Sequence, residues 1–318
     1  MNLTLDCDLN AAWLSNPASP ALAQLLAKGQ IRHQALPLEA LVCQQFGLSA
    51  TPDYPLAAIA AQADGLAADT GYWLRADPAH LVLQRDCLSL HESWPLAVSA
   101  EHAKVLLASL NQHFSAEGLC FMRGHSGAWY VHTAQSPQIK TSLPSAALAR
   151  NVHEFLAQGV DASRWLALLN EVQMLLHEHP VNVAREAAGE LALNSVWFSG
   201  GGCLPSRPAL AHELSSLMAD KVFYQGWAQL SGLPFSALVA NFTALLLESP
   251  RHLRVHLPCN DTLDSDWFAP LLLALQRQKI SQLQLNLGFY EQTLSLTVRP
   301  RDLYKFWCRS RPLMGYWA

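Results

Sequence analysis

The chain has 318 residues, of which 51% are hydrophobic and 14% charged, and its net charge is −4 at pH 7. So much apolar surface offsets the entropy lost on folding, which excludes a disordered chain, and the acidic balance argues against general nucleic-acid binding. No apolar run approaches the roughly 18 residues that span a membrane, and the N-terminal MNLTLDCDLN lacks the positive charge of a signal peptide. We therefore expect a cytoplasmic protein with neither nucleic acid nor a membrane as partner.

Helix-like and strand-like segments alternate along the chain, which predicts an α/β protein with a sheet core, flanking helices and a smaller α+β portion. The segment 57–63 is ambiguous by pattern; ending in Asp64-Gly65, it fits a buried strand closed by a turn. The other elements expected before residue 140 are a strand at 2–5, helices at 20–26, 38–46 and 100–114, a hairpin within 73–90, and strands at 119–122 and 129–133.

The second half of the chain contains the clearest helix, 165–176, whose apolar residues recur at i, i+3, i+4 and i+7. We treat the chain as a single unit with a soft division, in which residues 66–140 form a cap-like portion and residues 1–65 with 141–318 form the core. The remaining expected elements are a connector at 140–151, a strand at 193–198, helices at 212–230, 235–247 and 267–278, a strand at 253–257, and a terminal hairpin of 283–287 and 293–298 with its turn near Gly288.

Two acids, Asp6 and Asp8, come at the end of the first strand, where α/β enzymes often hold a metal-binding carboxylate. A later patch that contains His256 and Asp261 is also rich in acids and imidazoles, without a recognised ligand spacing. These four residues are the ligands we expect if the protein binds manganese or zinc; otherwise we expect no cofactor. The seven cysteines are scattered and form no C-x-x-C pair, which argues against a zinc ribbon or a disulfide framework.

The segment Asp77-Pro78-x-His80 brings an acid and an imidazole close together, as in acid–base pairs and metal sites. The alternative is a turn in which Asp77 bonds the local backbone ahead of the proline. His177 and His179 cannot share one ion on a helix, because residues two apart point about 200° away from each other. We interpret both histidines as solvated or capping groups at the C-terminus of a helix.

Asn182 and Arg185 follow a proline-started turn and offer the strongest signal of a binding site. The planar guanidinium of Arg185 suits a small carboxylate or phosphorylated ligand, because it donates two parallel hydrogen bonds. The alternative is an internal ion pair of Arg185 with Glu178 or Glu186.

Three consecutive glycines, Gly200, Gly201 and Gly202, follow the strand expected at 193–198. They are not a P-loop, because no Gly-Lys-Ser/Thr follows. Either they let a ligand approach the backbone closely or they form a simple tight loop.

Several segments resemble a known enzyme family. HPVNVAREAAGELALNSVWFSGGGCLP resembles the His-Pro-Val-Asn…Arg…Asn-x-x-Trp-x-x-Gly-x-Gly stretch of archaeal-type, bisphosphoglycerate-independent phosphoglycerate mutases, which belong to the alkaline-phosphatase-like superfamily of metalloenzymes. WLRADPAHLVLQRDCLSL and AEGLCFMRGHSGAWYV are similar to the inserted cap domain of the same enzymes. This resemblance implies the α/β fold of that superfamily, and it adds His179 and Asn194 to the residues expected to bind a ligand.

A closer match, over nearly the whole chain, is to bacterial RpfE-type regulatory or phosphoglycerate mutase-like proteins. FGLSATPDYPLAAIAAQADG, ADPAHL, WYVHTA, NEVQMLLHEHPVN and NSVWFSGGG carry it. The family's Asp-Gly-x-x-Asp opening reads LTLDCDLNAAW here, and its late His-x-x-x-Pro-Asp-x-x-x-His segment reads HLPCNDTLDSD, without the second histidine. No serine nucleophile can be assigned.

Two-metal phosphoryl transfer needs both ions to stabilise the attacking and leaving oxygens. With so few ligands, we expect a catalytically degenerate protein with a regulatory or small-anion-sensing role. One alternative is a structural protein that binds a partner through exposed tryptophans. The other is an active metal-dependent mutase or phosphatase that takes its ligands from Asp6, Asp8, Asp77, His80, His256 and Asp261.

Overall fold

The computed structural model describes residues 1–15, 19–84, 87–91, 95–148, 150–206, 214–246 and 251–317. The chain divides into two compact units: unit 1 comprises Met1–Gly47 with Ala209–Ala318, and unit 2 comprises Leu48–Pro208. Each unit is a sheet with helices packed on it, which confirms the expected α/β class. The portion 66–140, expected to be cap-like, lies within unit 2, which extends beyond it at both ends.

Unit 1 is built on a seven-stranded sheet with the order β12-β11-β13-β1-β14-β15-β2. The first five strands in this order run parallel, and β15 and β2 are antiparallel to their neighbours. The carboxyl end of β1 therefore lies between those of β13 and β14, at the edge where α/β proteins bind ligands. The strands are β1 (Asn2–Asp8), β2 (Gln30–Gln34), β11 (Ser216–Met218), β12 (Phe235–Ser236), β13 (His252–Leu257), β14 (Gln282–Phe289) and β15 (Gln292–Val298).

The long strands of this sheet alternate apolar and polar residues, although parallel strands are usually apolar on both faces. β1 reads NLTLDCD, β13 reads HLRVHL and β14 reads QLQLNLGF. The register pairs Asp6 of β1 with His256 of β13 and Asn286 of β14. Because successive side chains point to opposite faces, the sheet of unit 1 has one apolar face and one polar face.

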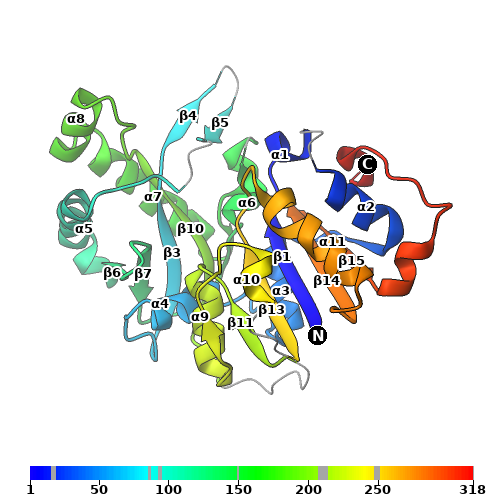
Figure 1. The fold of residues 1–318 in the computed structure, drawn as a ribbon. Coiled ribbons are helices and arrows are strands. Elements are labelled where there is room, and N and C mark those ends of the chain that lie inside the picture. The colour runs from blue at the N-terminus through cyan, green and yellow to red at the C-terminus, as the bar shows by residue number, and fades with distance from the viewer. Residues whose placement is uncertain are drawn as a thin grey trace. The chain divides into compact units, whose positions relative to one another are not determined.

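The apolar face carries the core of unit 1, in which leucines of the strands pack against aromatic and aliphatic residues of the helices. Figure 1 shows α2 and α11 together on this side of the sheet. The helices that supply this core are α1 (Ala11–Ser15), α2 (Pro20–Lys28), α10 (Phe242–Leu245) and α11 (Ala269–Gln276), the last preceded by a π-helical turn at Asp264–Phe268.

The polar face is covered by α3 (Leu38–Gln45), which contacts β1, β14 and β15, and by α9 (Val222–Ser231), which contacts β11. Phe46 and Trp227 stack with ring centroids 4.7 Å apart and join the two helices. The polar residues of the strands are therefore buried beneath two helices and must find hydrogen-bond partners there.

Unit 2 is built on a four-stranded antiparallel sheet with the order β10-β3-β7-β6. Its strands are β3 (Tyr72–Ala79), β6 (Leu119–Arg123), β7 (Trp129–Thr133) and β10 (Ser195–Gly202), beside the short pairs β4 (Leu81–Leu83) with β5 (Leu88–Leu90) and β8 (Ile139–Lys140) with β9 (Gln158–Gly159). Its helices are α4 (Leu56–Ala63), α5 (Ala100–Phe114), α6 (Pro144–Ala147), α7 (Ala162–Leu176) and α8 (Pro180–Ala187).

The amphipathic helices α5 and α7 pack on this sheet with the spacing that the sequence predicted. Leu106, Leu110 and Phe114 of α5 are fully buried, as are Val172 and Leu176 of α7. Together with residues of β3, β6 and β7, they form the core of unit 2.

Three expected elements differ in the structure. The ambiguous segment 57–63 is the helix α4 rather than a strand. The helix expected at 212–230 is instead β11 followed by α9, and the one expected at 235–247 is β12 followed by α10. Residues 207–213 and 247–250, which belong to or border those two expected helices, lie outside the described residues. Short strands next to helix-forming residues explain these errors, because β11 and β12 span only three and two residues.

The three glycines are part of strand β10, so the interpretation of them as a tight loop is wrong. Added side chains would meet Pro55 at Gly202 and Leu56 at Gly200. The glycines therefore allow these protein groups to pack closely against β10.

Gly201→Ala is expected to destabilise unit 2 by about 1–3 kcal/mol, the usual cost of overpacking. A Cβ at Gly201 would overlap the hydroxyl oxygen of Tyr72, which is buried and cannot turn away into solvent. Urea unfolding of the full chain measures the loss. Gly315→Ala is the matched control, because its Cβ would meet nothing closer than 3.9 Å, and equal stability of the two variants would contradict the packing role.

Candidate functional site

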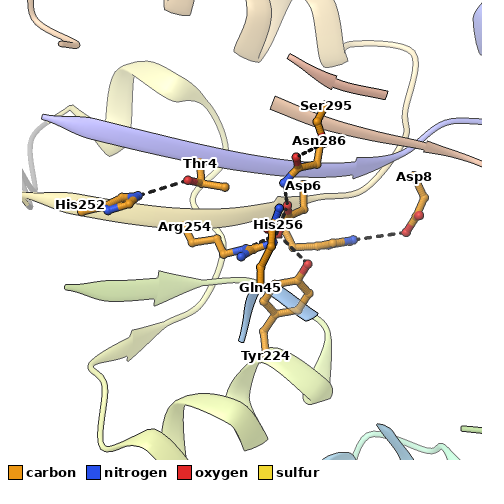
Figure 2. Close-up of polar contacts among 10 residues, drawn as sticks. All are labelled: Thr4, Asp6, Asp8, Gln45, Tyr224, His252, Arg254, His256, Asn286 and Ser295. Carbon is orange, nitrogen blue, oxygen red and sulfur yellow. Dashed lines mark hydrogen bonds and ion pairs between the residues drawn. The ribbon is translucent and has the colours of Figure 1, made fainter. Parts of the chain in front are cut away.

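A hydrogen-bonded chain of polar side chains crosses the polar face of the unit 1 sheet. Arg254 of β13 and Asn286 of β14 both donate to Asp6 of β1, which lies between them. The chain continues from Asn286 to Ser295 of β15, whose hydroxyl donates to the amide oxygen at 2.9 Å, and then to Gln34 of β2. We call these five residues the sheet network; Figure 2 shows all of them except Gln34.

Asp6 is the centre of the sheet network and is fully buried. Arg254 donates to both of its carboxylate oxygens, from Nε at 2.6 Å and from Nη2 at 3.0 Å. The hydroxyl of Tyr224 donates to Oδ2 at 2.9 Å and the amide of Asn286 to Oδ1 at 2.8 Å (Figure 2). Gln45 accepts from Nη2 of Arg254 at 2.8 Å. Each carboxylate oxygen of Asp6 thus accepts two hydrogen bonds from protein groups.

Asp8 lies one strand repeat further, at the carboxyl end of β1. Its Oδ2 is 2.7 Å from Nζ of Lys221 and 3.5 Å from Nε2 of His256. His256 is buried, whereas Asp8 keeps 35% and Lys221 45% of its side chain exposed. Asp8 therefore forms a half-exposed ion pair at the edge of the sheet, next to a buried imidazole.

The charges at this edge follow from these contacts. Burial would raise the pKa of Asp8, but the Lys221 ammonium and the His256 ring outweigh it and lower that pKa. Burial opposes the charge of Lys221 as well, but Asp8 raises its pKa. Burial, with the nearby Lys221, lowers the pKa of His256. At neutral pH the edge therefore holds a carboxylate, an ammonium and a neutral imidazole.

The donor set here does not fit the two-metal centre that the resemblance implies. Both oxygens of Asp6 accept hydrogen bonds from protein donors, and Lys221 holds Asp8. Asp261 is exposed in the turn after β13, and in the described part of the chain its side chain makes no hydrogen bond or ion pair. Within the described residues, no group of three or more His, Cys, Asp or Glu side chains is placed to hold a metal ion.

The residues expected to bind an anion lie in unit 2, on α8. Arg185 is buried; it donates from Nε to the Leu191 carbonyl at 2.9 Å and from Nη2 to the Ala97 carbonyl at 3.1 Å. Its ion pair is with Glu190 at 3.0 Å, and not with Glu178 or Glu186 as the internal-pair alternative supposed. The guanidinium thus holds the chain after α8 in place.

Asn182 and His179 also bond to the protein. The Asn182 amide donates to the carbonyls of Leu176 and Leu193, and its oxygen accepts from the Leu193 N–H. His179 caps α8, because its Nδ1 accepts from the Val181 N–H at 3.2 Å. This histidine therefore caps the N-terminus of a helix, and not the C-terminus at which a capping role was expected.

The other candidates in unit 2 have separate partners. Asn194 makes two hydrogen bonds to the backbone of Leu81, at 2.7 and 2.9 Å. Asp77 lies within strand β3, not in a turn, and pairs with Arg75. His80 bonds through Nδ1 to the Ala192 carbonyl at 2.7 Å. Asp77 and His80 therefore do not form the expected acid–base pair.

A cavity of about 370 Å³ opens in unit 2 between the start of β6, the end of β7 and the first turn of α7. Trp165 and Leu168 give it an apolar wall, and Arg164 is the only cation among its lining residues. In the described part of the chain, the Arg164 side chain makes no hydrogen bond or ion pair and is exposed. The lining also contains Glu117 and Asp161. Arg164 is thus the one lining residue that could attract an anionic group of a small ligand, beside two acidic residues.

The three donors to Asp6 were not expected from the sequence: Tyr224, Arg254 and Asn286. The sequence could have predicted a buried ion pair for Arg254, because an arginine in the middle of the apolar strand HLRVHL needs a buried partner. Asp6 in LTLDCD is the matching acid. No comparable pattern marks Tyr224, which reaches Asp6 from a helix.

No protein-family model matches the chain. Over 110 residues it is 26% identical to the 2,3-bisphosphoglycerate-independent phosphoglycerate mutases of Methanosarcina mazei and Methanosarcina barkeri. The matched stretch is 34% of this chain and 28% of each relative, so the chain spans little more than a quarter of the mutases it matches.

Two solved structures are also similar. The cofactor-independent phosphoglycerate mutase of Thermoplasma acidophilum has a TM-score of 0.44 at 14% identity, covering 94% of this chain and 89% of that one. A Pyrococcus horikoshii protein has a TM-score of 0.48 at 12% identity, covering 94% and 87%. In the described residues, no helix has the length and apolar character to cross a membrane. The sequence relatives confirm the resemblance to phosphoglycerate mutases, and the narrower RpfE-type assignment stays a prediction.

Proposed function

We propose that this chain is a phosphoglycerate mutase-like protein that has lost two-metal phosphoryl transfer and now acts as a regulatory, small-anion-sensing protein. The observation that carries the proposal is the pairing of both expected metal-binding acids with cationic side chains. Arg254 holds Asp6 and Lys221 holds Asp8. A divalent ion would have to displace both cations, and displacing the buried Arg254 would leave its charge unpaired.

The sensing part of the proposal is supported by the cavity in unit 2. A volume of about 370 Å³ is enough for a small metabolite. Arg164 is exposed there without an ion pair among the described residues, whereas Arg185 is buried in backbone contacts. We therefore place the anionic group of the ligand at Arg164.

An assay of the interconversion of 2- and 3-phosphoglycerate tests the loss of catalysis. With manganese, magnesium or zinc added, we expect no turnover above the protein-free background, because the carboxylates that would hold the ions are paired with protein cations. Metal content is measured by mass spectrometry on protein purified without chelators. Wild-type turnover that disappears in Asp8→Asn would overturn the proposal and favour the active metal-dependent mutase or phosphatase. A metal content of about two ions per chain would do the same.

Calorimetric titration with 3-phosphoglycerate tests the sensing role. Arg164→Ala should weaken binding by about 1.5–3 kcal/mol, the scale of a hydrogen bond to a charged group. Lys104→Ala, which removes an exposed cation from α5, is the matched control and should bind like the wild type. A loss confined to Arg185→Ala would move the site to α8, where the sequence analysis had placed it. Absence of binding in the wild type would remove the sensing role.

A further inference from the structure

Two aromatic residues occupy the tip of a tight turn near the end of the described chain. The Cys308 N–H donates to the Lys305 carbonyl at 3.1 Å, so Phe306 and Trp307 are the two central residues of that turn. Phe306 is 86% exposed and Trp307 67% exposed. In Figure 1 this turn belongs to the red segment that follows β15. We call residues 305–308 the aromatic turn.

Folding does not explain these two side chains. The central positions of tight turns favour Gly, Asn, Asp, Ser or Pro, each for a conformational reason that aromatic residues do not share. The rings contact each other edge to face at 5.0 Å between centroids and otherwise remain exposed. A locally unfavourable residue choice without a packing gain points to a function outside the fold.

The aromatic turn is held in place by hydrogen bonds to the end of α2. Nζ of Lys28, at the end of α2, donates to the carbonyls of both Lys305 and Cys308, at 2.5 and 2.9 Å. In return, Lys305 donates to the Lys28 carbonyl at 3.2 Å and pairs with Asp302 at 2.8 Å. The two lysines thus fix both ends of the turn, which lowers the entropic cost of binding through its tip.

The segment around the aromatic turn is basic in a chain of net charge −4. Asp302 is its only acid and is paired with Lys305. Arg301 and Arg309 are exposed on either side of the tip. The cations between residues 299 and 311 are Arg299, Arg301, Lys305, Arg309 and Arg311.

We propose that the aromatic turn is an anchor that inserts Phe306 and Trp307 into the interface of an anionic lipid membrane, with Arg301 and Arg309 bound to the headgroups. A protruding tip needs no matching pocket in a fluid surface, and aromatic rings with flanking cations suit the boundary between headgroups and acyl chains. Among the described residues no helix could span a membrane, but an interfacial anchor requires no span. The proposal is independent of the proposed function.

Flotation of the full chain with lipid vesicles tests the anchor. Binding is expected to vesicles of phosphatidylcholine that contain about 30 mol% phosphatidylglycerol and not to pure phosphatidylcholine, because the arginines need anionic headgroups. Serine at both Phe306 and Trp307 should lower the partition coefficient about 100-fold, roughly tenfold for each buried ring. Alanine at both Arg301 and Arg309 should lower it about 30-fold, and about 0.5 M salt should release the wild type.

The matched control replaces two equally exposed apolar residues of unit 2, Leu83 at 81% and Met174 at 77% exposure, with serine. This double variant should float like the wild type. Quenching by brominated lipids gives a second readout, since Trp307→Phe should remove the quenched part of the tryptophan emission while flotation persists.

Three results would overturn the anchor. One is the absence of wild-type binding to anionic vesicles, and another is binding that survives serine at both Phe306 and Trp307. The third is self-association of the wild type, seen as a concentration-dependent mass by light scattering, that is lost in the double-serine variant, together with no binding of the wild type to vesicles. That outcome would assign the aromatic turn to contact between two copies of the chain.

Discussion

Asp6→Ala is expected to lower the free energy of unfolding of unit 1 by about 3–5 kcal/mol, because it leaves a buried arginine without its counter-charge. Arg254 keeps only 6% of its side chain exposed, so water cannot replace the carboxylate. Tyr224 and Asn286 lose an acceptor in the same step, and a buried donor without a partner adds to the cost.

The measurement is urea unfolding of the full chain, combined with hydrogen exchange of the peptides that cover β1 and β13. Exchange in those peptides assigns the loss to unit 1, since the two units need not unfold together. Asp8→Ala is the matched control on the same strand. Its ion pair with Lys221 is half exposed, and such pairs contribute about 0–1 kcal/mol. Equal effects of the two substitutions would contradict the central role of Asp6.

Replacing Asp6 and Arg254 together, by Leu and Met, separates the penalty of an unpaired charge from the value of the pair. Because the double variant buries no charge, it should recover most of the stability lost in Asp6→Ala. A double variant as unstable as the single one would mean that the sheet network stabilises unit 1 through its hydrogen bonds more than through charge compensation.

The strands and amphipathic helices of this fold were predictable where a period was long enough to see. The helix expected at 165–176 is α7, and the terminal hairpin is β14 with β15, because each shows several repeats of its own period. Strands β11 and β12 were not predictable, since three and two residues carry no period. The helix α4 was ambiguous, because its alanine-rich sequence is apolar on all sides.

The site was less predictable than the fold, because residue type alone does not reveal which donors a side chain meets. Asp6 and Asp8 were identified as acids at a strand end, and both are there. Their partners Lys221, Arg254 and Asn286 lie more than 200 residues further along the chain. Only the tertiary structure therefore shows that cations lie where metal ions were expected. Arg185 shows the converse, because a guanidinium that suits an anion binds two backbone carbonyls instead.

Asn182→Ala is expected to lower the free energy of unfolding of unit 2 by about 3 kcal/mol, because it leaves two buried backbone groups without partners, each costing about 1–3 kcal/mol before relaxation. Those groups are the carbonyl and the N–H of Leu193, which is itself buried. The carbonyl of Leu176 loses one of two donors and keeps the His179 N–H. The side chain therefore ties the end of α7 to the segment that leads into β10.

Urea unfolding and calorimetric titration with 3-phosphoglycerate, made on the same Asn182→Ala protein, separate a structural role from a binding role. We expect lower stability with unchanged affinity at temperatures where the variant stays folded, since the amide is 4% exposed and both of its polar atoms are engaged. Asn170→Ala on α7 is the matched control, because among the described residues its side chain makes no hydrogen bond; it should change stability by less than about 0.5 kcal/mol. Weaker binding with unchanged stability would return Asn182 to the ligand site that its sequence pattern predicted beside Arg185.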